Sequence, residues 1–173
     1  METQIQNLGE GKIDFPFPNY NFVDDSCRVL YDVSENYFID CVKNNRAPIT
    51  FELAGPRSKI YFDPKKLKCA IVTCGGLCPG LNDVIRGIVM ALYHMYGVRN
   101  IFGIRYGYEG FIPRCGHDMI ELSPAQVDGI HDIGGTILGS SRGHQEIGEI
   151  VDAIERLNLG ILFTIGGDGT LTA

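Results

Sequence analysis

The stretch LGILFTIGGDGT, residues 159–170, decides the fold. Residues 159–165 are an apolar run rich in β-branched and aromatic side chains, which predicts a strand buried on both faces of a parallel sheet. The run ends in the sequence GGDGT at residues 166–170. In open α/β sheets, ligands bind beyond the carboxyl ends of the strands. The sequence therefore predicts a ligand site at residues 166–170.

The residue types in GGDGT suit a phosphate group bound together with a metal ion. The three glycines let backbone N–H groups approach a bulky anion. Asp168 would hold a divalent cation that bridges phosphate oxygens; an Asx turn or a helix N-cap is the structural alternative. Thr170 would stand at the start of a following helix, where free N–H groups favour negative charge. The chain ends three residues later, and we expect no helix to form in that space.

Length and composition indicate an ordinary soluble globular protein. The 173 residues can bury one core, and 45% of them are hydrophobic and 21% charged. The net charge of −6 argues against nucleic acid or an anionic membrane as a partner. We find no apolar run that could cross a bilayer and no signal peptide, so we expect a cytoplasmic protein. The six cysteines show no CxxC spacing, which favours reduced thiols.

Residues 1–66 differ in character from the rest of the chain. They contain FPFP at residues 15–18 and several Asn/Asp clusters, and their hydrophobic periodicity is weak. One short helix is expected over residues 33–44. We interpret this region as an extended arm that wraps the core or forms an oligomer contact. For the first dozen residues a partly disordered leader is the alternative.

From residue 67 onward, strands, glycine-rich loops and helices alternate. The expected elements are a strand at 68–74, a helix capped by Asn82 and closed by Gly97, a strand at 98–104, a helix from the capping box at 123–126 to Gly134, a short extended segment at 136–139, a helix at 145–157 and the strand at 159–165. This alternation is typical of right-handed βαβ crossovers. It predicts a Rossmann-like α/β fold with a mostly parallel sheet and helices on both faces.

Two further loops carry candidate phosphate contacts. The loop GGLCPG at residues 75–80 would present N–H groups to phosphates, but it matches neither a Walker loop nor GxGxxG, and a plain strand-to-helix turn is the alternative. Arg142, in SSRG, would clamp phosphate oxygens, unless it is a solvated surface arginine. Tyr106 and Tyr108 either stack on a base or pack their loop. The histidines lack ligand spacing, and CGHD at residues 115–118 lacks a fourth zinc ligand.

Four motifs together resemble 6-phosphofructokinase. They are GGLCPGLN at 75–82, YGYEGF at 106–111, GGTILGSSRG at 134–143 and GGDGT at 166–170. Their order and spacing match the family from about residue 68 to the end of the chain. The segments FELAGPR at 51–57 and IYF at 60–62 are similar to the plant- and protist-type branch. Four motifs in register are far more specific than any one of them.

The resemblance implies a glycolytic kinase that transfers phosphate from ATP to fructose 6-phosphate, giving ADP and fructose 1,6-bisphosphate. Residues 67–173 would be the nucleotide-binding α/β domain and residues 1–66 an extension. The implied ATP contacts are Gly76, Tyr108, Arg142, Gly143, Gly167, Asp168, Gly169 and Thr170. Asp168 would bind Mg²⁺ and Arg142 would be catalytic. A glycine at 169 goes with ATP and an aspartate there with pyrophosphate, because a carboxylate would repel the α-phosphate. A homo-oligomer is implied for the full-length enzyme.

Two features of the family are not matched. The catalytic aspartate motif Thr-Ile-Asp-Asn-Asp and the sugar-phosphate site would lie beyond residue 173, so we expect this N-terminal portion to bind ATP poorly and to catalyse nothing measurable alone. Arg86 matches one effector-site arginine of the bacterial enzymes, but Met90 replaces the next. Three alternatives stay open: a pyrophosphate-dependent enzyme, another GGDGT kinase of the diacylglycerol or NAD kinase type, and a non-catalytic nucleotide-binding fragment.

Overall fold

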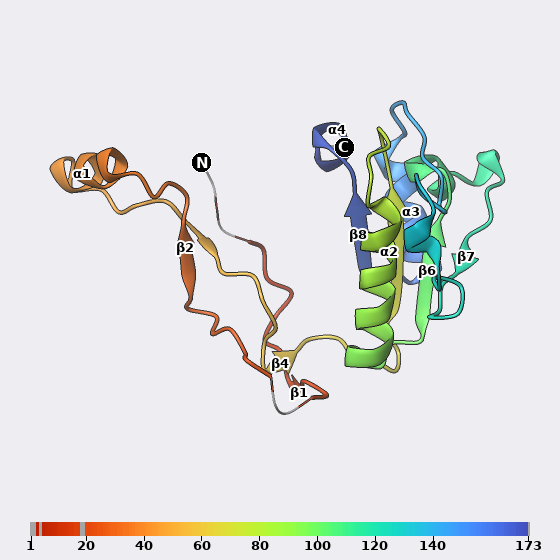
Figure 1. The fold of residues 1–173 in the computed structure, drawn as a ribbon, viewed down its shortest axis with the longest axis horizontal. Helices are drawn as coiled ribbons and strands as arrows, with labels where there is room; N and C mark the ends of the chain where they lie inside the picture. Colours follow the sequence, from red (N-terminus) through yellow and green to blue (C-terminus); the bar gives the residue numbers. More distant parts are fainter. Residues whose placement is uncertain (1–2, 4, 18–19, 173) are drawn as a thin grey trace. The chain divides into compact units, whose positions relative to one another are not determined.

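A four-stranded sheet in the order β7-β6-β5-β8 organises the C-terminal two thirds of the chain (Figure 1). Its strands are β5 (Lys68–Thr73), β6 (Asn100–Ile104), β7 (Ile120–Glu121) and β8 (Ile161–Ile165). The central strand β5 pairs in parallel with β6 and with β8, whereas β7 pairs antiparallel with β6. The mostly parallel sheet expected from the sequence is therefore confirmed.

The computed structural model describes residues 3, 5–17 and 20–172, so Pro18 of the FPFP segment lies outside the described residues. The chain divides into two compact units, Met1–Tyr61 and Phe62–Ala173. The domain boundary near residue 66 and the roles given to the two domains stay predictions. Across the described ranges, no helix has both the length and the apolar character needed to span a membrane.

Helices cover both faces of the sheet because β5 sends alternate side chains to opposite sides. Cys69 and Ile71 pack in one core cluster with Ile85 and Val89 of α2 (Leu81–Met90). The intervening residues of β5 pack in a second cluster with Ala153 of α3 (Ile147–Leu157). Figure 1 shows α2 in front of the sheet and α3 behind it. The predicted arrangement with helices on both faces is confirmed.

Short helical segments complete this unit. They are the π-helical η1 (Ala91–Tyr96), the 3₁₀ helices η2 (Gly107–Phe111), η3 (Pro113–Cys115) and η4 (Ile130–Asp132), and the single turn α4 (Asp168–Leu171). Gly97, at φ +75°, ends the helical stretch of α2 and η1 as predicted. The strand β8 carries the chain to α4 at the carboxyl end of the sheet (Figure 1). The loops that follow β5 and β8 therefore meet at one edge.

The N-terminal unit is built from two small antiparallel sheets and one helix. Its elements are β1 (Ile13–Asp14) paired with β4 (Lys59–Ile60), β2 (Arg28–Leu30) paired with β3 (Thr50–Glu52), and α1 (Glu35–Lys43). Ser34 caps α1, which confirms the helix expected over residues 33–44. Among its described residues, only Phe15 and Cys41 are buried apolar side chains. The interpretation of this unit as an extended arm stays a prediction.

The helix expected from Ser123 to Gly134 does not form. The side chains of Ser123 and Gln126 hydrogen-bond to each other, whereas a capping box pairs each of them with a backbone N–H group. Turns cover residues 124–129, and only η4 follows. Gly129 adopts φ +74°, which a right-handed helix cannot accommodate. The expectation of an extended segment at residues 136–139 is also wrong, because a hydrogen bond of 3.2 Å from Gly139 N to Thr136 O closes a turn there.

The last strand and the last helical turn also differ from expectation. The strand β8 is half-buried rather than buried on both faces, since within the described part of the chain it has a partner, β5, on one side only. The chain continues into α4, so one helical turn forms where we expected none. Thr170 is the third residue of that turn rather than its start.

Asn82 is not the N-cap of α2. The helix begins at Leu81, and Gly80, at φ +90°, occupies the N-cap position. Asn82 therefore lies inside the first turn, where its side chain is buried. Its amide bonds to a distant loop rather than to the helix end.

Candidate functional site

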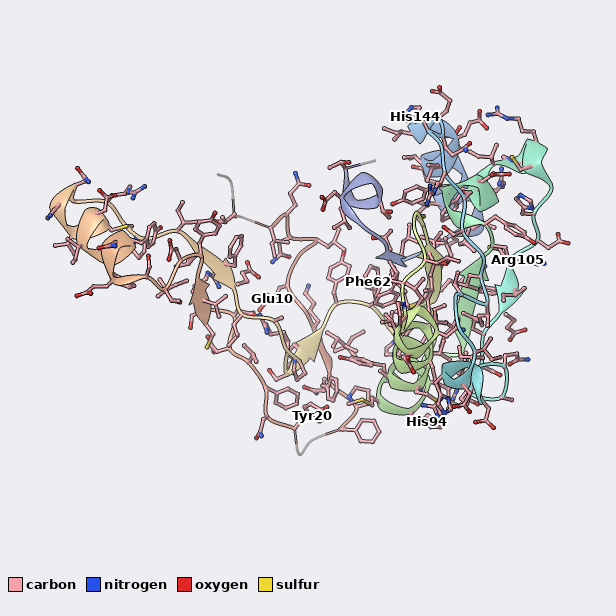
Figure 2. All side chains as sticks on the ribbon, turned by 45° about the horizontal axis from the view of Figure 1, so that its top comes forward. Glu10, Tyr20, Phe62, His94, Arg105 and His144 are labelled. Atoms are coloured by element: carbon pink, nitrogen blue, oxygen red, sulfur yellow. The ribbon has the colours of Figure 1, made fainter. Side chains whose placement is uncertain are left out.

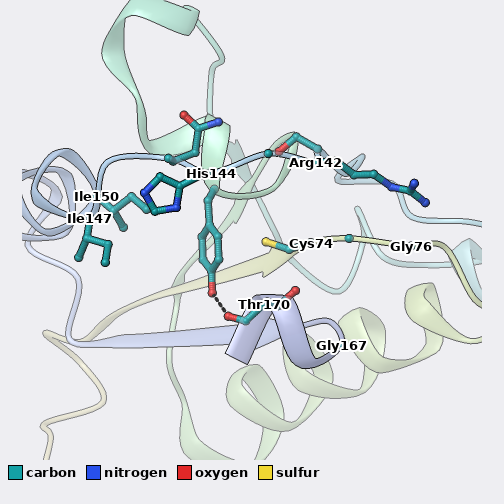
Figure 3. Close-up of a pocket in the computed structure, with 14 residues that line it drawn as sticks. Cys74, Gly76, Arg142, His144, Ile147, Ile150, Gly167 and Thr170 are labelled. Carbon is teal, nitrogen blue, oxygen red and sulfur yellow. Dashed lines mark hydrogen bonds between the residues drawn. The ribbon is translucent and has the colours of Figure 1, made fainter. Parts of the chain in front are cut away.

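A cavity of about 480 Å³ opens where β5 and β8 end (Figure 3). It is lined by Cys74, Gly75, Gly76, Tyr108, Ser141, Arg142, Gly143, His144, Gln145, Ile147, Ile150, Gly167, Gly169 and Thr170. These residues come from the loop after β5, from η2, from the loop that leads into α3, and from the segment after β8. The structure therefore brings together seven of the eight predicted site residues. The eighth, Asp168, does not line the cavity.

Asp168 lies beside the cavity, between two glycines that do line it. Its side chain is exposed, and it forms no ion pair or side-chain hydrogen bond with any described residue. Gly167 caps α4 without a side-chain bond, so the N-cap interpretation of Asp168 is wrong. Magnesium usually binds through one or two carboxylates together with water and phosphate oxygens. An unengaged carboxylate at this place fits that requirement. Elsewhere in the described chain, no group of three His, Cys, Asp or Glu residues is arranged to hold a metal.

Three of the lining glycines are not required by the protein's own packing. A Cβ atom at Gly167 or Gly169 would meet no described atom within 4 Å, and one at Gly76 would meet only Arg142 Nη2, at 4.0 Å. All three have backbone φ angles that any residue adopts. Gly166 is different, because a Cβ there would collide with the side chain of Thr170. The protein's own packing therefore leaves space for a side chain at positions 76, 167 and 169, on the wall of the cavity.

Arg142 supplies the positive charge at this end of the cavity. Its exposed guanidinium extends toward Gly76 (Figure 3), and it forms no ion pair with any residue that the structure describes. The loop that carries Arg142 is fastened to the end of β5. Ser140 Oγ donates to Gly75 O at 2.6 Å, and Thr73 Oγ1 donates to Gly139 O at 2.8 Å. Arg142 is thus an exposed cation on an anchored loop beside the cavity, and its role in binding phosphate stays a prediction.

Tyr108, in the wall of the cavity, is hydrogen-bonded to α4. Its hydroxyl donates a hydrogen bond of 2.8 Å to Thr170 O (Figure 3). Burial raises the pKa of the Tyr108 hydroxyl above its usual value, with a smaller contribution from Cys74. Burial also raises the pKa of the Cys74 thiol. Both groups are therefore protonated near pH 7, so Tyr108 acts as a donor and Cys74 as an apolar wall rather than a nucleophile.

The opposite end of the cavity is apolar, and sequence reasoning missed it. Ile147 and Ile150 project from the start of α3, next to His144 (Figure 3). Ile147 is 56% exposed, so its side chain is accessible to a ligand in the cavity. His144 lies far from His94, at the other end of this unit (Figure 2). Their position in the sequence could have indicated this end of the cavity, because Ile147 and Ile150 lie in the first turn of α3, shortly after the predicted Arg142 loop.

The cavity therefore has a polar end and an apolar end. Open glycine backbone and a guanidinium at one end suit phosphate groups. Isoleucine side chains at the other end suit a flat apolar ring system. A ligand with both parts, such as a nucleotide, matches this arrangement.

Comparisons with known proteins agree with this chemistry. The sequence pattern described as phosphofructokinase matches residues 68–173. The ATP-dependent 6-phosphofructokinase of Borreliella burgdorferi is 45% identical over 177 residues, which cover 98% of this chain and 39% of that protein. The ATP-dependent 6-phosphofructokinase of Entamoeba histolytica is 55% identical over 120 residues, covering 69% of this chain and 27% of the relative. The chain thus spans less than two fifths of the length of either curated relative.

A solved structure supports the same grouping. The crystal structure of Pichia pastoris phosphofructokinase in the T-state aligns with a TM-score of 0.56 at 28% identity. The alignment covers 73% of this chain and 14% of that one.

Proposed function

The chain belongs to the phosphofructokinase family, and from this premise we propose that its cavity binds ATP with Mg²⁺ as the nucleotide part of a 6-phosphofructokinase active site. The complete reaction would transfer the γ-phosphoryl group of ATP to fructose 6-phosphate, giving ADP and fructose 1,6-bisphosphate. The observation that carries the proposal is the set of three glycines around the cavity whose missing side chains serve neither packing nor backbone conformation.

The phosphate chain would lie along the glycine segments. The backbone N–H groups near Gly76 and Gly167 would donate to phosphate oxygens, since no Cβ blocks their approach. The guanidinium of Arg142 would donate two parallel hydrogen bonds to one phosphate group. Because Gly169 lies on the same wall, the α-phosphate can approach the backbone there.

The base and ribose would lie at the apolar end. Ile147 and Ile150 offer a surface for an adenine ring, and Tyr108 borders the path between the two ends. His144 and Gln145 supply side chains that can hydrogen-bond polar edges of the base or the ribose. A cavity with such an apolar end favours a nucleotide over pyrophosphate, which has no part to place there.

Asp168 would hold the magnesium ion. Its carboxylate is exposed beside the phosphate end and is not engaged by any described residue. The ion would supply positive charge that offsets the negative charge of the phosphate groups. The carboxylate fixes the place at which that charge is supplied.

Arg142 would act in the transfer itself. Besides the nucleotide cavity it lines a second cavity of about 330 Å³, together with Leu77, Thr136 and Ser140. Its charge therefore reaches the space on the far side of the phosphate end. A guanidinium at that border stabilises negative charge as a phosphoryl group moves from donor to acceptor.

We also propose that the family's usual setting applies: a cytoplasmic enzyme of glycolysis that works as a homo-oligomer. Cell fractionation with an antibody against this chain tests the first part. Light scattering of the full-length enzyme after size exclusion tests the second, and a full-length monomer at all concentrations would contradict it.

Calorimetric titration of the chain with MgATP, MgADP and magnesium pyrophosphate tests the nucleotide assignment. We expect ATP to bind at least tenfold more tightly than pyrophosphate, and Asp168→Asn to reduce the benefit that Mg²⁺ gives to ATP binding. The matched control is Asp152→Asn, an exposed aspartate of α3 that does not line the cavity. Equal affinity for ATP and pyrophosphate would favour the pyrophosphate-dependent alternative. Because this portion is expected to bind ATP weakly, the titration extends to high nucleotide concentrations, and absence of ATP binding there would contradict the assignment.

A further inference from the structure

Asn82 is a buried polar residue whose role the sequence did not reveal. Its side chain is 2% exposed, at the second position of α2. Its Nδ2 donates to Ile133 O at 2.8 Å, and its Oδ1 accepts from Ile137 N at 2.9 Å. The amide therefore satisfies one carbonyl and one N–H group of a segment more than fifty residues further along the chain.

The two hydrogen bonds join the two loops that face each other across the phosphate end. Asn82 is the second residue after the glycine loop at residues 75–80. The segment at residues 133–139 leads within three residues to Arg142. The other links between these loops start from β5 or from Gly75, on the cavity side. Asn82 holds the same loops together from the helix side.

A carboxamide is the side chain that can do this at this place. Asparagine offers a donor and an acceptor on one short planar group, which aspartate and leucine of similar size do not. An alanine at position 82 would remove the hydrogen-bond partners of Ile133 O and Ile137 N, both of which are part-buried contacts. The residue type therefore follows from the two backbone groups that it satisfies.

We propose that Asn82 is a positioning residue that sets the spacing between the glycine loop and the Arg142 loop, and thereby the affinity of the cavity for the phosphate chain. The inference rests on the proposed function, because it concerns the same cavity. Asn82 itself does not line that cavity, so its effect is exerted through the two loops.

The variant Asn82→Asp separates positioning from general damage. An ionised aspartate still accepts from Ile137 N, but it turns a second oxygen toward Ile133 O and loses that hydrogen bond. A protonated aspartate regains a donor, and its burial raises the pKa so that protonation occurs above the usual range. We therefore expect its ATP affinity, relative to wild type at the same pH, to be about tenfold lower at pH 8 and within about twofold at pH 5.5. Taking the ratio to wild type at the same pH corrects for the pH dependence of ATP and for the charged groups that both proteins share, such as Asp83, Arg86, His131 and Asp132.

Two further variants serve as controls. Asn82→Ala removes both hydrogen bonds and should lose about tenfold in affinity at both pH values. Val89→Ala weakens the same helix from its fully buried core side and leaves both hydrogen bonds of Asn82 in place. We expect Val89→Ala to lower the melting temperature but to leave the ATP affinity of the folded protein within twofold.

Amide hydrogen exchange of residues 133–139 at pH 8, without nucleotide, reports on the loops directly. Exchange should be about tenfold faster in Asn82→Asp than in wild type and unchanged in Val89→Ala. If wild type binds ATP and Asn82→Asp binds it with the same affinity at pH 8, the inference is overturned and the proposed function stays intact. Absence of ATP binding by wild type would overturn both.

Discussion

Replacing Gly169 should change the ATP affinity and the free energy of unfolding in opposite senses. A Cβ at this position meets no described atom within 4 Å, and the backbone conformation suits any residue. Gly169→Ala should therefore raise the free energy of unfolding by about 0.5 kcal/mol, because alanine restricts the unfolded chain. The same methyl group enters the cavity, so we expect ATP affinity to fall.

Gly169→Asp adds a charge to the same wall. A carboxylate about 5 Å from a charged phosphate oxygen costs about 3 kcal/mol at an effective dielectric constant of about 20. That corresponds to roughly a hundredfold loss of ATP affinity. Pyrophosphate lacks the α-phosphate of a nucleotide and its attached ribose, so its affinity should fall less. The ratio of ATP to pyrophosphate affinity should therefore drop.

Calorimetric titration and chemical denaturation of the same samples supply both quantities. Gly87 is the matched control site, since it lies within α2, has equally open surroundings and does not line the cavity. Gly87→Ala and Gly87→Asp should leave ATP affinity unchanged. ATP binding within threefold of wild type in Gly169→Asp would refute the reasoning. So would a loss of more than about 1 kcal/mol of stability in Gly169→Ala, because glycine would then be needed for packing.

Three further predictions concern other parts of this unit. Arg142→Ala should cost about 1.5–3 kcal/mol of ATP binding free energy in titrations, because it removes charged hydrogen bonds, and Arg142→Lys should recover only part of that loss. A change of more than about 0.5 kcal/mol in the free energy of unfolding would contradict the exposed position of Arg142. Tyr108→Phe removes the hydrogen bond to Thr170 O, worth about 1 kcal/mol, so amides of residues 168–172 should exchange about fivefold faster; unchanged exchange would show that α4 is held otherwise. Burial raises the pKa of the Cys69 thiol to about 11, from an ordinary value of 9.0. The stability linked to the protonated thiol is therefore complete below pH 9 and is lost as pH rises through 11. Denaturant titrations should show a loss of about 3 kcal/mol that disappears in Cys69→Val, and an unchanged pH slope in that variant would refute the assignment.

The features predictable from the sequence are those determined by local pattern. The apolar run of β5 and the amphipathic spacing of α3 give the sheet and its two covered faces. The glycine motifs after β5 and β8 place the cavity, because parallel strands bring their carboxyl ends to one edge. The position of Arg142 at the cavity could be predicted on a different ground, because the small residues beside it in SSRG leave room for a ligand.

The features that sequence missed depend on contacts between distant segments. Asn82 has the residue type of a helix cap, and only the approach of residues 133–137 shows that its amide is used elsewhere. The pattern at Ser123 favours a helix start, but Gly129 stops it after a few residues. Ile147 fits an inward-facing helical position, and only its exposure shows that it lines the cavity.

The open edge of β8 has a practical consequence for work with this polypeptide. Its unpaired N–H and C=O groups can recruit the same edge of another molecule, as exposed strands do when they nucleate aggregates. Concentrated samples should consequently become turbid before dilute ones, whatever the free energy of unfolding. Thr164, whose side chain is already solvated on that strand, is the natural place for a lysine gatekeeper that keeps concentrated preparations dispersed.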